Sequence, residues 1–137
     1  MGKKRLREMS WDDYGISIFR YKELQAFCMQ YDEKKAKIDR GISGLNYDGI
    51  SGSSGKGDAL EKKAIRNAGY EKDCRMIEQA AVMAAPEFSE YIIESVTKDM
   101  SYSEVMYDKD GNRIPVGKTD FYAHRRLFYH LLDSLKI

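Results

Sequence analysis

The residues best suited to metal chemistry lie in the C-terminal part of the chain. Both histidines, His124 and His130, are there, but they are six positions apart, and two metal ligands on one helix face need a spacing of four. Asp108, Asp110 and Asn112 are spaced like the start of a calcium loop, yet the glycine stands at position four instead of six. We therefore expect a hairpin-like turn at this point and no metal site.

A glycine-rich segment raises the question of nucleotide binding. Residues 52–57 read GSSGKG, but they lack the GxxxxGK[ST] spacing and no strand pattern precedes them. HExxH, GxSxG and paired-cysteine motifs are absent from the sequence as well, and Cys28 and Cys74 are far apart. We expect no catalytic residues, no cofactor and two reduced thiols, so an enzyme is the least favoured class.

The strongest candidate for a site is the polar face of the last predicted helix. The pattern predicts a short helix over Ser101–Tyr107, opened by a capping box, and a longer one from about Thr119 to Leu135. This pair is typical of a helix-turn-helix, whose second helix enters the major groove with its N-terminal turn. The predicted DNA-binding residues are Lys118, Thr119, Asp120, Tyr122, Arg125 and Arg126.

Each of these residues receives a predicted role. Lys118, Arg125 and Arg126 would neutralise phosphates, while the other three would face base edges. Helical spacing places Tyr122, Arg125, Arg126 and Tyr129 away from the apolar face formed by Phe121, Phe128 and Leu131. Accessory phosphate contacts are expected from Lys3, Lys4, Arg5 and Arg113. The alternative is an ordinary solvated face on a packing helix.

Helices are expected to position this site, and the predicted fold class is all-α. The first helix is predicted to open at a capping box between Ser10 and Asp13 and to end near Gly41. Its length exceeds what a small core needs, which favours pairing with another helix or with a second copy of the chain. A second copy of the chain, paired through the long helices as a homodimer, is therefore one expected partner.

Three regions follow from this pattern. Residues 1–41 form a basic arm and the long helix, residues 42–57 form a flexible Gly/Ser-rich linker, and residues 58–137 form a helical domain ending in the helix-turn-helix at about 101–135. Within the last region a helix runs to about Ala85, and another begins at Pro86 and ends near Lys98. We expect a helical bundle.

Composition and charge restrict the partners. The chain has 137 residues, 42% of them hydrophobic, and no apolar run long enough to cross a bilayer. We expect one domain in the cytoplasm. Residues 1–57 carry 11 basic and 8 acidic side chains, residues 58–110 carry 7 and 12, and residues 111–137 carry 5 and 2. Two basic ends favour a polyanion such as double-stranded DNA, although chance explains offsets of this size nearly as well.

The chain also resembles a known family, the small phage and prophage late-gene regulators of the RinA and ArpU type. The ending is the most specific part, with SYSEV at 101–105, IPVGKTDFY at 114–122 and RRLFY at 125–129. Further resemblance lies in RYKEL at 20–24, the Gly/Ser linker, AIR at 64–66, MIEQA at 76–80 and YII at 91–93.

The resemblance implies a function. It implies a phage-encoded transcriptional regulator of packaging and lysis genes in a bacterial host, with a sigma-factor-like helix-turn-helix and residues 118–126 as the recognition helix. Host RNA polymerase is an implied further partner. Residues 108–113 lengthen the turn beyond the three or four residues usual in the motif. They would form a wing that touches the DNA backbone, or they would block the groove.

A second hypothesis uses the same helical scaffold to bind and inhibit a host protein. Such a chain would be an anti-defence factor of a phage or mobile element, for example an anti-CRISPR. The acidic stretch from Asp99 to Asp110 supports it, because clustered carboxylates can occupy a site meant for phosphates. The pI of about 7.7 is also low for a DNA-binding domain, for which values above about 9 are usual.

Overall fold

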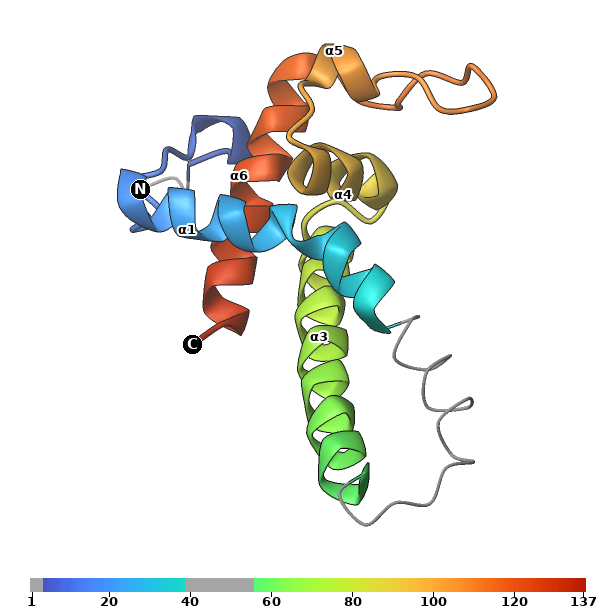
Figure 1. Ribbon diagram of the computed structural model, residues 1–137. Coiled ribbons are helices and arrows are strands. Elements are labelled where there is room, and N and C mark those ends of the chain that lie inside the picture. The colour runs from blue at the N-terminus through green and yellow to red at the C-terminus, as the bar shows by residue number, and fades with distance from the viewer. Residues whose placement is uncertain (1–3, 39–55) are drawn as a thin grey trace. The chain divides into compact units, whose positions relative to one another are not determined.

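The structure of this chain is a computed structural model that describes residues 4–38 and 56–137 (Figure 1). Within these residues the regular elements are helices, accompanied by one isolated β-bridge between Tyr107 and Arg113. The elements are η1 (Leu6–Glu8), α1 (Ile18–Met29), α3 (Lys56–Ala84), α4 (Ser89–Lys98), α5 (Tyr102–Val105) and α6 (Lys118–Leu135). Residues 31–38 are helical as well. The predicted all-α fold class is confirmed for the described part of the chain.

The prediction that the first helix begins at Ser10 is wrong. The capping contacts do form, since the Ser10 N–H and Oγ lie 2.8 and 3.0 Å from Asp13 Oδ2. The chain nevertheless makes only a turn there, because Gly15 adopts a left-handed conformation with φ of 70°. Helix α1 begins at Ile18, and the Ser17 Oγ caps it by accepting a hydrogen bond from the Arg20 N–H at 3.1 Å.

The predicted helix is also interrupted in its middle. The helical pattern stops at Gln30 and resumes over residues 31–38, where the Lys34 N–H donates to the Gln30 carbonyl at 2.9 Å. No glycine or proline marks this break in the sequence. The predicted end at Gly41 and most of the predicted linker 42–57 lie outside the described residues, whereas residues 56 and 57 belong to α3.

The later helices agree with the sequence predictions to within a few residues. Helix α3 ends at Ala84, α4 ends at Lys98, and α6 begins at Lys118. Pro86 lies in a turn before α4, which begins at Ser89 and not at the proline itself. In the part of the chain that is described, no helix is long and apolar enough to cross a membrane.

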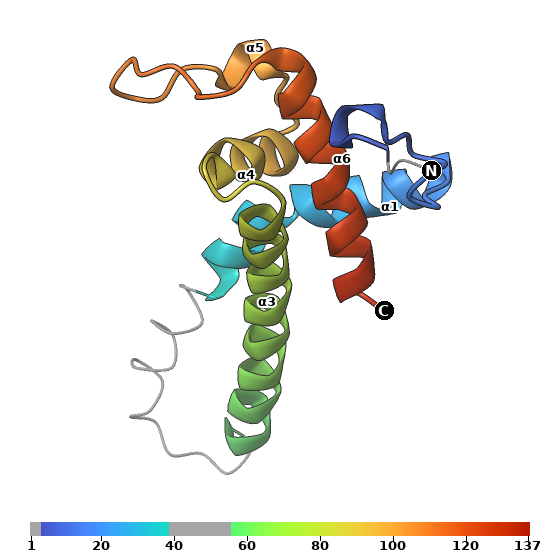
Figure 2. The same ribbon diagram turned by 180° about the vertical axis from the view of Figure 1, so that it is seen from behind.

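The chain forms two compact units, one of Met1–Met29 with Met76–Ile137 and one of Gln30–Arg75. In the first unit α6 lies alongside α1, α4 and α5 (Figures 1 and 2). Its core consists of side chains from all four helices, among them Leu24, Cys28, Ile92, Val96, Tyr102, Val105, Phe121, Phe128, Tyr129 and Leu132. The buried leucine of α6 is thus Leu132, while the predicted Leu131 is half-buried.

The second unit brings residues 31–38 against α3. The Lys34 Nζ lies 2.9 Å from Asp73 Oδ2, and the lysine is 6% exposed. The Cys74 thiol lies 3.9 Å from the Tyr31 carbonyl. A nearly buried lysine needs such a counter-ion, so this pair fixes the register of the two helical segments.

Candidate nucleic-acid interface

Helix α5 begins with the capping box that the sequence predicts. The Ser101 N–H and Oγ each donate a hydrogen bond of 3.0 Å to Glu104 Oε1. These hydrogen bonds favour the carboxylate and lower the pKa of Glu104. The cap holds Tyr102 and Val105 in the core, and this places α5 beside the start of α6.

Two tyrosine hydroxyls join α5 to α6. The Tyr102 Oη donates to the Val116 carbonyl at 2.7 Å, and the Tyr102 N–H donates to the Tyr122 Oη at 2.9 Å. The Phe121 ring meets the Tyr102 ring edge-on with centroids 5.4 Å apart. The prediction that Tyr122 faces base edges is therefore wrong for its hydroxyl, which is occupied by the backbone of α5.

The segment between the two helices is a hairpin. Asp108 Oδ1 accepts the N–H groups of Asp110 and Asn112 at 2.9 and 2.8 Å, and Gly111 takes a left-handed φ of 82°. The side chain that resembled a calcium ligand therefore closes a turn, as the sequence predicts. The hairpin projects away from the helices (Figures 1 and 2), and residues 107–113 are exposed.

The start of α6 is exposed at three residues, before the part that the N-terminal arm and the core cover. Gly117, Lys118 and Thr119 are exposed, and within the described residues Lys118 takes part in no ion pair. The Phe121 N–H already bonds the Gly117 carbonyl, so the N–H groups of the preceding turn have no acceptor within the helix. Lys118 and Thr119 are thus exposed at the start of α6, and their DNA-binding role stays a prediction.

The N-terminal arm, residues 4–9, covers the next part of α6. The Arg126 Nε donates to the Met9 carbonyl at 3.0 Å and its Nη2 to the Arg7 carbonyl at 3.4 Å. Arg7 in turn pairs with Asp120, with Nη2 and Oδ1 3.1 Å apart. The predicted phosphate role of Arg126 and base role of Asp120 are corrected accordingly, because both side chains hold the arm.

Arg125 is sandwiched by aromatic rings. Its guanidinium carbon lies 5.9 Å from the ring centroids of both Tyr122 and Tyr129. Tyr129 itself is fully buried against Trp11 and Tyr21, and burial raises the pKa of its hydroxyl. The prediction of an open basic face around Tyr129 is wrong, because the arm and α1 cover a second side of α6.

The accessory cations fall into three groups. Lys4 pairs with Asp13 at 3.0 Å, Arg5 and Arg113 are exposed, and Lys3 lies outside the described residues. The histidines are packed, since the His124 Nδ1 lies 2.7 Å from the Ala84 carbonyl and His130 stacks on Tyr14 with centroids 4.7 Å apart. The exposed Arg113 guanidinium interacts with the Tyr102 hydroxyl, so among the described members of the predicted accessory set Arg5 is the one that takes part in neither an ion pair nor such a contact.

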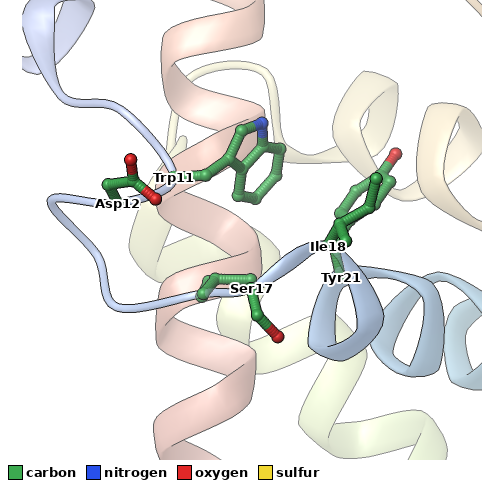
Figure 3. A pocket seen from close by; sticks show the side chains of 6 residues that line it. Trp11, Asp12, Ser17, Ile18 and Tyr21 are labelled. Carbon is green, nitrogen blue, oxygen red and sulfur yellow. The ribbon is translucent and has the colours of Figure 1, made fainter.

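Two hollows flank this region. One has a volume of about 380 Å³ and is lined by Trp11, Asp12, Ile16, Ser17, Ile18 and Tyr21 (Figure 3); no pattern in the sequence predicts it. The other, of about 560 Å³, lies between α4 and the hairpin and is lined by Glu90, Tyr91, Glu94, Lys98, Tyr107, Asp108, Lys109 and Asp110. Its four carboxylates outnumber its two lysines, and this net negative charge disfavours phosphates inside the hollow itself.

Comparison with family models, with curated proteins and with solved structures finds no match to this chain. The structural class of the protein therefore rests on its own fold. In its described residues it is an all-α protein in which a short helix, an exposed hairpin and the exposed start of a long helix follow one another in the chain.

Proposed function

We propose that this chain is a sequence-specific DNA-binding regulator in which α5, the hairpin and α6 act as a helix-turn-helix with an enlarged turn. The observation that supports the proposal is the exposure of Lys118 and Thr119 at the start of α6, a helix held against α5 by the Tyr102 and Tyr122 hydrogen bonds. A rigid helix N-terminus with free donors suits entry into a major groove.

The proposed contacts are narrower than those expected from sequence. Thr119 reads base edges, and Lys118 contacts a phosphate or a guanine. Lys109 and Arg113 on the hairpin and Arg5 on the arm contact the backbone, since all three are exposed. Arg125 and Arg126 act as positioning residues that keep the aromatic cluster and the arm on α6.

The biological setting of the proposal comes from the resemblance to RinA and ArpU-type regulators. The targets are late packaging and lysis genes of a phage or prophage, and the site of action is the cytoplasm of its bacterial host. Contact with host RNA polymerase and pairing of two copies of the chain belong to the same proposal.

A second candidate function has one specific observation in its favour. Glu90, Glu94, Asp108 and Asp110 line a single groove beside the hairpin. A carboxylate-rich groove fits a basic surface, such as the nucleic-acid channel of a host protein. The second candidate is therefore an inhibitor of a host nucleic-acid-binding protein, for example an anti-CRISPR.

The test is selection of duplexes from a random library by the full chain, followed by a salt titration of binding to selected and random duplexes. The proposal expects a recurring sequence, tighter binding to it, and a linear fall of log K with log salt. Lys118→Ala should reduce that slope by ~0.9, the value for one phosphate, or should weaken preference at one base pair by about 1–3 kcal/mol.

The matched control is Lys72→Ala, because Lys72 is an exposed lysine on α3 in the other unit. The control should bind like the wild type. Absence of an enriched sequence, together with capture of one basic host protein that is lost in Glu90→Gln/Glu94→Gln, would replace the regulator by the inhibitor.

A further inference from the structure

The second unit contains a cationic pocket that the proposed interface does not use. The pocket lies between residues 31–38 and α3 and has a volume of about 230 Å³. It is lined by Lys37, Lys63, Arg66, Asn67 and Tyr70, so among the described residues of its lining three are cations and none is a carboxylate. Within the described residues none of these three cations takes part in an ion pair.

The pocket lies on the face of α3 that packs against residues 31–38. Lys63, Asn67, Tyr70 and Cys74 recur at spacings of four, three and four, which places them on one face of α3. This face meets residues 31–38, as the contact of Cys74 with the Tyr31 carbonyl shows. An amphipathic helix normally has apolar residues on such a face, but here a lysine and an asparagine are half-buried on it.

The chemistry of the lining fits a phosphate. The Lys37 Nζ lies 5.4 Å from the centroid of the Tyr70 ring, so the ammonium group packs on the face of this ring. The Arg66 guanidinium, the two ammonium groups and the Asn67 amide are hydrogen-bond donors for anionic oxygens. Like charges held together without an anion repel one another, so a bound anion would remove an unfavourable interaction.

We propose that this pocket binds backbone phosphates of nucleic acid and is a second contact surface, on a different unit from α6. The choice of nucleic acid as the source of the phosphate rests on the proposed function. Two contact surfaces on separate units would raise affinity for a long duplex through effective concentration, without adding sequence preference.

The test uses the full chain and a random-sequence duplex, with binding measured by fluorescence anisotropy over a range of salt concentrations. The pocket variant is Lys63→Gln/Arg66→Gln. The control variant is Lys62→Gln/Lys72→Gln, which removes two exposed lysines of the same helix outside the pocket. Circular dichroism checks that both variants keep the helicity of the wild type.

The proposal expects the pocket variant to lower the slope of log K against log salt by ~1.8, or ~0.9 for each lost phosphate contact. Affinity for selected and random duplexes should fall by the same factor. The control variant should leave the slope near the wild-type value. Equal slopes for the pocket and control variants would overturn the proposal.

The failures of the two proposals can be told apart. If selection enriches no sequence but the pocket variant still loses slope, the pocket proposal stands and the regulator fails. If Lys118→Ala loses preference while the pocket variant behaves like the control, the reverse holds. If the Tyr70 ring signals shift with inorganic phosphate but the duplex slope is unchanged in the pocket variant, the site takes free phosphate and the nucleic-acid proposal is overturned.

Discussion

Arg7 and Asp120 form an ion pair across 113 positions of sequence, with the Arg7 Nη2 3.1 and 3.3 Å from the two carboxylate oxygens. The pair joins the N-terminal arm to the first turn of α6. Both side chains are about half exposed, at 54% and 45%, so the pair adds at most ~1 kcal/mol to stability. Its main effect is to place a carboxylate and a basic arm beside the residues proposed to contact DNA.

Asp120→Asn should therefore strengthen binding to random duplex. The change removes a negative charge next to Lys118 and Thr119, where phosphates would approach, and leaves a side chain of similar size. Stability should change by less than ~1 kcal/mol. Anisotropy titrations at two salt concentrations would measure the affinity. A weaker and less selective variant would instead mean that Asp120 accepts a hydrogen bond from a base.

Arg126→Ala should release the N-terminal arm. The substitution removes the hydrogen bonds to the Met9 and Arg7 carbonyls, and hydrogen bonds from a charged donor contribute about 1.5–3 kcal/mol. The free energy of unfolding should fall by that amount, and amide exchange of residues 5–9 should rise. Lys118→Ala is the control and should change neither quantity. Unaltered exchange in the arm would show that Arg126 does not hold it.

Tyr122→Phe should loosen the junction between α5 and α6. It leaves the Tyr102 N–H without its acceptor at 2.9 Å, which should cost about 1 kcal/mol. Chemical denaturation measures the loss. Tyr107→Phe provides a matched control, because Tyr107 is 59% exposed on the hairpin and its variant should be as stable as the wild type. Equal stability of the two variants would contradict the structural role of the Tyr122 hydroxyl.

The turn at Ser10 should be sensitive to acid. The Ser10 N–H, the Lys4 ammonium and the Ser10 hydroxyl lower the pKa of Asp13 from 3.8 to about 2. Because the folded pKa is below the unfolded one, the contribution of Asp13 to stability is present above pH 4 and is lost as the pH falls toward 2. An NMR titration of the Asp13 carboxyl should have its midpoint near 2.

Lys4→Ala should raise this midpoint, because it removes the ammonium 3.0 Å from the carboxylate. Lys22→Ala should leave the midpoint in place, since Lys22 lies over the Phe19 ring instead. An Asp13 titration at its ordinary value in the wild-type chain would mean that the turn does not form in solution.

The features predicted well from sequence depend on local signals. The Ser101–Glu104 cap, the turn at Asp108 and the start of α6 near Lys118 each follow from residues a few positions apart. The Ser10–Asp13 cap shows the limit of such signals. A capping box satisfies the same donors whether a helix or a single turn follows, so the pattern alone did not reveal that α1 begins at the Ser17 cap.

The candidate site was harder to predict because long-range contacts decide it. Periodicity along α6 predicts one apolar face, but Trp11 of the turn before α1 and Tyr21 of α1 cover a second one. Arg126 and Asp120 are engaged by residues more than 110 positions away, and nothing in the local pattern of α6 indicates those partners. Lys118 and Thr119 remained open because they precede the covered part of the helix.

Contact between the start of α6 and DNA can be observed residue by residue with NMR. Backbone amide shifts of the full chain would be followed during titration with a duplex obtained by selection. We expect the largest shifts at Gly117, Lys118 and Thr119 and in the 107–113 hairpin, and none in α4. Unchanged α6 amides at saturating duplex would contradict the proposed contact, whatever the affinity.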